Sequence, residues 1–99
     1  MEVDMTKETI IQVYKAIGHE TRLNILKFLW INSQQCVCEI QKDLELEQSN
    51  ISQHLRLLKT SGIITHTKVG NFMHYRINDQ HEMYPIIKEA ILHYVRSTS

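Results

Sequence analysis

The clearest helical repeat of apolar and polar positions in this chain covers residues 48–61. Ile51, Leu55 and Leu58 recur at intervals of four and three residues, which places them on one stripe of a helix. Polar residues recur at matching intervals on another stripe, and Gly62 follows the segment. The pattern therefore predicts a helix with one face for the core and one polar, mostly uncharged face.

The polar stripe of this helix is rich in Ser, Asn and Gln, which are poorer choices for a solvated helix surface than Glu, Lys or Ala. Gln and Asn present a donor and an acceptor together, and Arg can bond a guanine in two places, so this face suits the base edges of DNA. The residues assigned to DNA contact here are Gln48, Ser49, Asn50, Ser52, Gln53, Arg56 and Lys59. The alternative is an ordinary amphipathic helix with a serine-rich outer face.

Three further helical patterns precede this segment, over residues 6–17, 19–30 and 36–44. The first has Thr6 as a cap, and the second is apolar around much of its circumference, which predicts a central core helix. Residues 32–34 are expected to form a loop. Residues 45–47 are predicted to make a tight turn into the helix at 48, and two helices joined in this way are typical of a helix-turn-helix unit.

After Gly62 the period of the pattern changes from 3.6 to 2. Residues 63–69 and 72–77 are β-branched and aromatic runs separated by Gly70-Asn71, which predicts a β-hairpin, or wing. Its tip is placed to reach phosphates or a minor groove beside the helix. The wing residues assigned to DNA contact are Lys68, His74 and Arg76. A hairpin that only covers the core is the alternative.

Residues 79–96 predict a last helix, provided that Pro85 lies in its first turn. The expected fold class is therefore mainly α with a two-stranded β-wing, a winged helix-turn-helix with the order α-α-α-α-β-β-α. The 99 residues should form one domain. Its terminal helices, about 6–17 and 82–96, have broad apolar surfaces, so we expect them to meet a second copy in a two-fold dimer.

The composition, with 42% hydrophobic and 22% charged residues, is typical of a soluble globular protein. A chain of this size has little material to enclose a deep substrate pocket, and no catalytic constellation is evident, so no enzyme is expected. The apolar runs are short and residues 1–4 are acidic and polar, which predicts neither a membrane span nor a signal peptide. We expect a cytoplasmic protein.

The formal net charge is zero, but the charges are segregated along the chain. Residues 48–78 contain four Lys or Arg and no Asp or Glu, so all 11 acidic residues lie elsewhere. A basic block that contains a polar helix is expected of a phosphate-contacting surface. A winged-helix module that binds protein and not DNA is the alternative, and the lack of carboxylates argues against it.

Cys36 and Cys38 are too close in sequence for a loop-closing disulfide, and a reducing compartment should keep them as thiols. Two thiolates are soft donors that suit thiophilic ions. Residues two apart in a regular helix point to nearly opposite sides, so joint ligation requires the first turn to unwind. A switch based on oxidation or persulfidation and a pair of small buried hydrophobes are the alternatives.

The residues that carry a family resemblance are Cys36-Val37-Cys38-Glu39-Ile40, the run from Gln48 to Leu55, Gly62-Ile63-Ile64 and the entry to the second helix from Ala16 to Leu23. Together they resemble the ArsR/SmtB family of winged-helix metal-responsive repressors over essentially the whole chain. Members are homodimers that bind operator DNA and leave it when an inducer binds. The resemblance implies a homodimeric repressor, double-stranded DNA with an inverted repeat as its partner, and no membrane partner or organic cofactor.

The resemblance also implies a thiolate site at Cys36 and Cys38 for arsenite, antimonite, cadmium or lead. Arsenite sites usually have a third sulfur, and the position where some relatives hold it is occupied by Gln41. Residues 1–35 contain no cysteine. The third donor would then be a buffer thiol, His19 or a carboxylate such as Glu39.

A second possible site resembles the interfacial zinc or cobalt site of the family, in which an Asp-x-His pair meets ligands from the other subunit. Its residues here are Asp79, His81 and His93, but the residue three positions after His93 is Arg96, which cannot ligate. The interval from His81 to His93 is also one residue longer than in zinc-binding relatives. Glu89, one turn before His93, is the substitute ligand. Solvated polar residues on a dimer-forming helix are the alternative.

Overall fold

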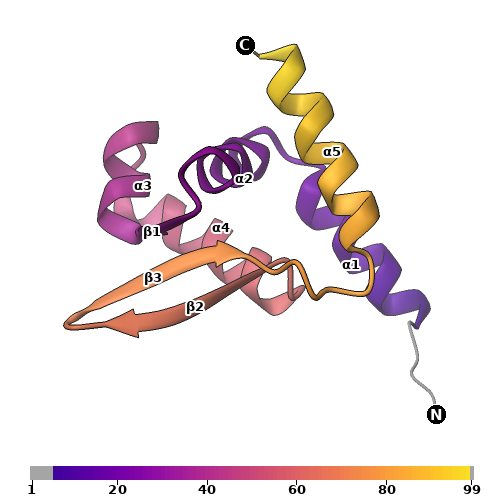
Figure 1. The fold of residues 1–99 in the computed structure, drawn as a ribbon, viewed down its shortest axis with the longest axis horizontal. Helices are drawn as coiled ribbons and strands as arrows, with labels where there is room; N and C mark the ends of the chain where they lie inside the picture. The colour runs from indigo at the N-terminus through magenta and orange to yellow at the C-terminus, as the bar shows by residue number, and fades with distance from the viewer. Residues whose placement is uncertain (1–5, 99) are drawn as a thin grey trace.

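A computed structural model describes residues 6–98 of the chain and has the predicted winged helix-turn-helix architecture (Figure 1). Residues 1–4, expected to be a polar N-terminus, lie outside the described residues. The helices are α1 (Lys7–Ile17), α2 (Glu20–Asn32), α3 (Val37–Leu44), α4 (Gln48–Thr60) and α5 (Tyr84–Ser97). The strands are β1 (Gln34–Cys36), β2 (Ile64–Val69) and β3 (Phe72–Ile77). Among the described helices, none is long and apolar enough to cross a membrane.

Local chemistry explains where the elements begin and turn. Thr6 caps α1 as expected, because its Oγ1 accepts a hydrogen bond from the Thr9 backbone N–H at 3.1 Å. His19 caps α2 in the same way through its Nδ1, which accepts from the Thr21 N–H at 3.1 Å. Gly70 turns the hairpin with φ +64°, a conformation that costs glycine little.

The sheet has three strands in the order β1-β3-β2, both pairings antiparallel, and not only the two strands of the predicted wing. The expected loop at residues 32–34 was wrong, because α2 continues to Asn32 and β1 begins at Gln34. Strand β1 pairs with β3 so that Gln35 lies opposite Tyr75. This pairing joins segments about 40 residues apart, which the local pattern of three residues does not encode.

The last helix begins at Tyr84 and not at residue 79, and Pro85 lies in its first turn as required. The preceding residues form a turn with its own hydrogen bonds. The side chain of Asn78 accepts from the Gln80 backbone N–H at 3.0 Å, and the His81 ring accepts from the Met83 N–H at 2.9 Å. These bonds satisfy backbone groups outside a helix, which is why the helix starts later than predicted.

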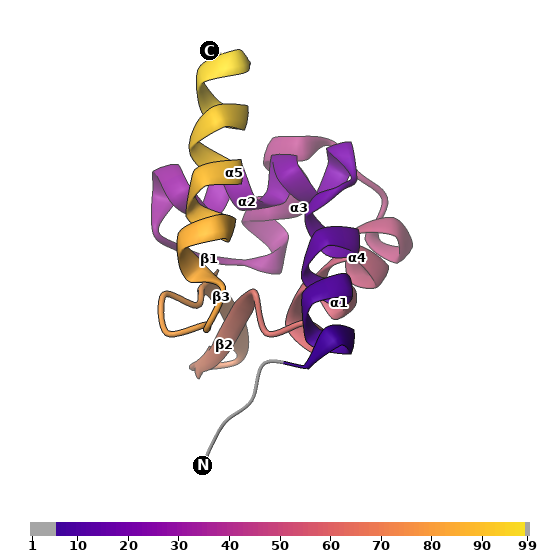
Figure 2. The ribbon, with the colours of Figure 1, turned by 90° about the vertical axis from the view of Figure 1, so that its right-hand side faces the viewer.

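The core is built around α2, as its broad apolar surface predicts, with buried side chains from α1, α4 and α5 around it. Figure 2 shows α1 and α5 together on one side of the molecule, in front of α2 and α3. The wing extends toward the opposite side (Figure 1). The fold therefore separates the terminal helices from the tip of the wing.

Candidate DNA interface and cysteine site

Helix α4 has the two faces that its sequence predicts. Ile51, Leu55 and Leu58 are buried in the core. The polar face of α4 consists of the exposed residues Gln48, Ser49, Asn50, Ser52, Gln53, Arg56 and Lys59. Because the apolar stripe fixes the rotation of the helix, this whole polar set is held toward solvent, where it can contact a partner.

The turn between α3 and α4 spans residues 45–47, as predicted. Glu45 ends α3 in the left-handed conformation, with φ 54° and ψ 46°, and its N–H donates to the Gln41 carbonyl. Leu46 also donates to the Gln41 carbonyl, at 3.2 Å. A non-glycine residue in this conformation is uncommon, and nothing in the sequence indicated it at Glu45. These bonds fix the direction in which α4 leaves α3.

Arg22 on α2 connects α1 to α4, a contact that the sequence did not indicate. Its Nε and Nη2 donate to the carbonyls of Ala16 and Lys15 at 2.6 and 2.9 Å. Its Nη1 lies 3.1 Å from Nδ1 of His54, whose ring also lies against that of His19 with 4.8 Å between centroids. Burial, then the nearby His19 and Arg22, lower the pKa of His54. Because a guanidinium can only donate, Nδ1 of His54 is the acceptor in this contact.

The wing presents its predicted DNA-contacting residues on two different faces. His66 and Tyr75 are opposite each other in the register, with ring centroids 5.9 Å apart, and Lys68 shares their face because strand residues alternate. His74 and Arg76 lie on the other face. Lys68 and Arg76 are exposed and His74 is half-buried. Tyr75 also lines a groove with polar-face residues of α4, so Lys68 is the wing cation on the side of α4.

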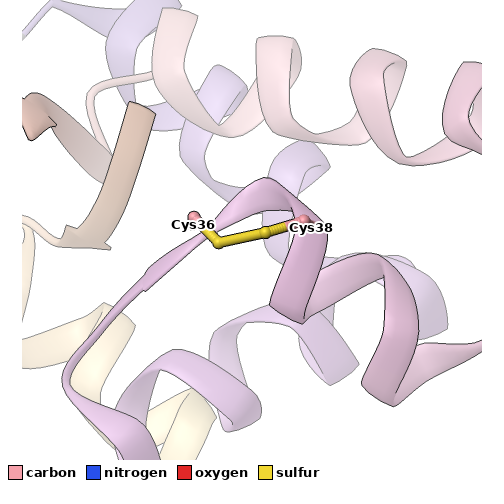
Figure 3. Close-up of a disulfide and its surroundings, with 2 residues drawn as sticks. All are labelled: Cys36 and Cys38. Atoms are coloured by element: carbon pink, nitrogen blue, oxygen red, sulfur yellow. A yellow bond between two sulfur atoms is a disulfide. The ribbon is translucent and has the colours of Figure 1, made fainter. Parts of the chain in front are cut away.

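The two cysteines are joined by a disulfide where β1 passes into α3 (Figure 3), so the expectation of free thiols was wrong. Cys36 is not in the helix but caps it in an extended conformation, with φ −77° and ψ 163°. Cys38 lies in the first helical turn, and the two Cα atoms are 5.4 Å apart. The extended cap lets both sulfurs meet without unwinding the helix, which a helix beginning at Cys36 would have required.

The donor set at this position fits a thiophilic ion in part. When reduced, the two sulfurs can face one point; Cys36 is 8% exposed and Cys38 is exposed, which leaves a path from solvent. Among the described residues, no three His, Cys, Asp or Glu side chains are gathered as a metal site. His19, a proposed third donor, uses its Nδ1 to accept from the Thr21 N–H at the start of α2, and its ring lies against that of His54. Within residues 6–98, the donors held together at this position are therefore the two sulfurs, with no third His, Asp or Glu gathered beside them.

The second predicted site, Asp79, His81, Glu89 and His93, is not brought together within one chain. His81 Nδ1 accepts from the Met83 N–H, so its Nε2 carries the proton and donates to the Ser61 carbonyl at 2.9 Å. Both ring nitrogens are therefore bonded. Glu89 and His93 form an exposed pair at 3.5 Å, and Asp79 accepts from Gln80.

The terminal helices expose large apolar side chains, as the expected dimer requires. Ile11 and Tyr14 on α1 are each 51% exposed, and Ile86 on α5 is also exposed. A groove of about 450 Å³ runs beside α1, with Tyr14 and Leu57 among its lining residues. Exposed apolar area of this kind marks an interaction surface.

Comparison with known proteins places these features in context. The profile described as "Bacterial regulatory protein, arsR family" matches residues 19–66. The cadmium resistance transcriptional regulatory protein CadC homolog of Staphylococcus aureus is 32% identical over 93 residues, covering 91% of this chain and 76% of that protein. The arsenical resistance operon repressor of Escherichia coli K12 is 40% identical over 68 residues, covering 69% of this chain and 58% of that protein. The structure of HlyU from Vibrio cholerae N16961 is similar with a TM-score of 0.73 and 31% identity, covering 92% of this chain and 97% of that one.

Proposed function

Because this chain belongs to the arsR family of bacterial regulatory proteins, we propose that it is a homodimeric repressor released from its operator by a thiophilic metal or metalloid ion. Its relatives are transcriptional regulators and not enzymes. DNA binding through a helix-turn-helix and regulation of transcription accompany membership of the family. Three points go beyond membership of the family and are proposed here: the dimer, the form of the operator and the identity of the ion.

The observation that carries the proposal is the polar face of α4, held outward by a buried apolar stripe. Amide and hydroxyl groups there match the donors and acceptors of base edges in a major groove. Arg56, Lys59 and Lys68 surround it with positive charge, and residues 48–78 contain no carboxylate to repel phosphates. Base reading is assigned to Gln53 and its neighbours, and phosphate contact to Lys68 and Arg76.

The form of the operator follows from the proposed dimer. Two copies related by a two-fold axis through α1 and α5 would present two α4 helices to successive major grooves of one duplex. The half-sites should then form an inverted repeat about 34 to 36 Å apart, or a small multiple of that distance.

In vitro selection from random duplex DNA tests this function directly. The purified protein should enrich a duplex with an inverted repeat and bind it as a dimer, with affinity that falls as salt rises. If the protein binds no duplex at either a low or a higher salt concentration, the proposal is contradicted and a protein-binding module is favoured. Protection of a single half-site by a monomer would contradict the dimer alone.

The proposed inducer site is the Cys36 and Cys38 pair, and the ion is arsenite, antimonite, cadmium or lead. Two relatives are named for cadmium and arsenical resistance, and thiolates suit these soft ions. The pair lies at the start of α3, and only residues 45–47 separate α3 from α4. An ion that moves the start of α3 would therefore act on the orientation of the polar face of α4.

Metal analysis of the reduced, anaerobically purified protein tests this assignment. Cadmium or arsenite should displace zinc in competition, and loss of both sulfurs should abolish binding of the ion. Zinc binding that survives in Cys36→Ser and Cys38→Ser would instead support a site at Asp79, His81, Glu89 and His93. The bonded nitrogens of His81 make that set less favourable, because a metal would have to replace the Ser61 or the Met83 contact.

The disulfide supports a second candidate, a repressor switched by oxidation. Hydrogen peroxide can oxidise the two thiols to a disulfide, and its two oxygen atoms leave as two water molecules. Persulfidation is a related route: one thiolate attacks the outer sulfur of a low-molecular-weight persulfide, and the thiol of that donor leaves. In this case peroxide under metal-free conditions should change DNA affinity, and a dithiol reductant should restore it. No effect of peroxide, together with release by cadmium, would exclude this candidate.

A further inference from the structure

The tip of the wing, residues 68–73, gathers exposed apolar side chains in an otherwise polar neighbourhood. Phe72 is 60% exposed, Val69 46% and Met73 38%. They flank the Gly70-Asn71 turn, and a Cβ placed on Gly70 would meet nothing within 4 Å. Exposed apolar side chains gathered at one place in this way mark an interaction surface, because a partner that covers them removes apolar area from water.

The register shows how these side chains are arranged. Val69 and Phe72 lie opposite each other, so they share one face of the tip. Lys68 and Met73 lie opposite each other on the second face. The tip therefore has one cation and three apolar side chains, whereas a tip that contacted phosphates alone would need cations or hydrogen-bond donors.

We propose that Phe72 enters the minor groove beside the site contacted by α4 and wedges between two base pairs, while Lys68 contacts a flanking phosphate. This inference rests on the proposed DNA-binding function. The minor groove is about 6 Å wide, which admits a side chain although not a whole ribbon. Apolar wedges at such positions unstack a base step and kink the duplex toward the major groove.

The position and charge of the tip favour DNA over a second copy of the chain as its partner. Figure 1 shows the tip at the opposite end of the molecule from α1 and α5, the helices that expose apolar faces for a dimer. The stretch that contains the tip has no carboxylate. A partner that lies next to α4, receives an apolar ring from one face of the tip and meets a lysine on the other has the properties of duplex DNA, with its stacked bases and flanking phosphates.

A wedge gives the protein a source of specificity that the polar face of α4 does not supply. Unstacking costs least at flexible pyrimidine–purine steps such as TA and CA. The operator should therefore have such a step where the tip of each wing lies, outside the bases contacted by α4. Replacing it by a stiff step should weaken binding although no hydrogen bond is lost.

The test uses the duplex enriched by the full-length protein, with 2-aminopurine placed in turn at each step flanking a half-site. Binding of the wild type should raise the 2-aminopurine fluorescence at one flanking step. Phe72→Ala should remove that rise and weaken binding about tenfold, with the salt dependence unchanged. Phe72→Leu should retain part of both effects, because it keeps an apolar side chain. Ile31→Ala, at an equally exposed apolar position at the end of α2, is the matched control and should change neither.

Each contrary result has a separate meaning. If the wild type binds no duplex, the proposed function itself fails. If it binds and Phe72→Ala behaves like the wild type, only the wedge fails. If Phe72→Ala loses affinity but the wild type raises the 2-aminopurine fluorescence at no flanking step, the wedge also fails. If Phe72→Ala changes the oligomeric state of the protein, the tip contacts protein and not DNA.

Discussion

Arg22 and His54 meet at 3.1 Å between Nη1 and Nδ1, and this contact joins α2 to the middle of α4. The same guanidinium bonds the carbonyls of Lys15 and Ala16 at the end of α1. One side chain thus links the helix with the exposed apolar face to the helix with the polar face. A relative movement of α1 and α4 must break this link or move α2 with it.

Substitution of Arg22 should destabilise the fold. Arg22→Ala removes three hydrogen bonds from a charged donor and should lower the free energy of unfolding by about 1 to 3 kcal/mol. Arg22→Lys keeps the charge but lacks the planar guanidinium with its several donors, so it should recover only a minor part of the lost free energy of unfolding. Urea unfolding followed by circular dichroism measures both. If Arg22→Ala and the wild type have the same free energy of unfolding, water replaces the hydrogen bonds of the guanidinium without any loss of stability.

The contact should also make stability depend on pH through His54. The folded protein lowers the pKa of His54 below its ordinary 6.5, so the unfolded chain takes up this proton first as pH falls. The stabilisation is therefore complete above pH 6.5 and is lost as pH falls through the lowered value. Between about pH 7.5 and about pH 5.5, the unfolding midpoint should fall less in His54→Gln than in the wild type. Identical falls would show that His54 does not contribute.

Lys68 and Gln53 should affect DNA binding in different ways. Lys68→Ala should weaken specific and non-specific binding alike and reduce the salt slope by roughly one unit. Gln53→Ala should cost about 1 to 3 kcal/mol on the selected duplex alone. Lys88→Ala, on α5 away from the wing, is the control and should leave the slope unchanged. The reverse pattern would mean that the wing reads sequence and α4 only positions the protein.

The dimer should depend on the exposed face of α1. Ile11→Glu places a charge where about half of an apolar side chain is exposed and available to a second copy, so it should shift the protein toward monomer. DNA affinity should fall with it, because each half-site would then bind separately. Ile31→Glu, at a comparably exposed position, should leave the dimer intact. Sedimentation velocity measures the masses; an unchanged mass for Ile11→Glu would move the interface elsewhere.

The sequence predicted the elements whose signals are local. The buried stripe of α4 follows from apolar spacing, and the hairpin follows from its alternating pattern and Gly70. Strand β1 was missed because Gln34, Gln35 and Cys36 have no apolar alternation and pair only with the distant β3. The start of α5 was placed five residues early because the hydrogen bonds of the preceding turn are side-chain bonds.

The candidate site was predictable where it depends on one helix and not where it depends on contacts between elements. All seven residues assigned to the polar face of α4 are exposed as expected. The Arg22 contact joins residues 32 positions apart, and spacing cannot show it. The strand predicted to begin at Phe72 is confirmed, but an aromatic residue directly after a Gly-Asn turn fits the start of a strand as well as an exposed tip, so spacing alone does not indicate the exposure of Phe72. The thiols were expected to point apart because Cys36 was assigned to a helix that it only caps.

The last prediction concerns the coupling between the cysteines and DNA. Cadmium or arsenite bound by reduced Cys36 and Cys38 should lower DNA affinity through α3, because only residues 45–47 separate α3 from α4. A coupling of about 1 to 3 kcal/mol is usual for such linkage, and DNA must weaken the binding of the ion by the same factor. Cys36→Ser and Cys38→Ser should each bind the selected duplex normally yet resist release by the ion.

Titrations of the wild type and both variants with cadmium and with arsenite, under reducing conditions, measure this coupling. Fluorescence anisotropy of the duplex gives DNA affinity, and thiolate absorption gives ion binding, so the reciprocal factor can be checked in one series. If both variants are released from the duplex at the same ion concentration as the wild type, the two thiolates take no part in the response to the ion. Asp79, His81 and His93 would then be the next site to test, with His81 released from its bonds to Ser61 and Met83.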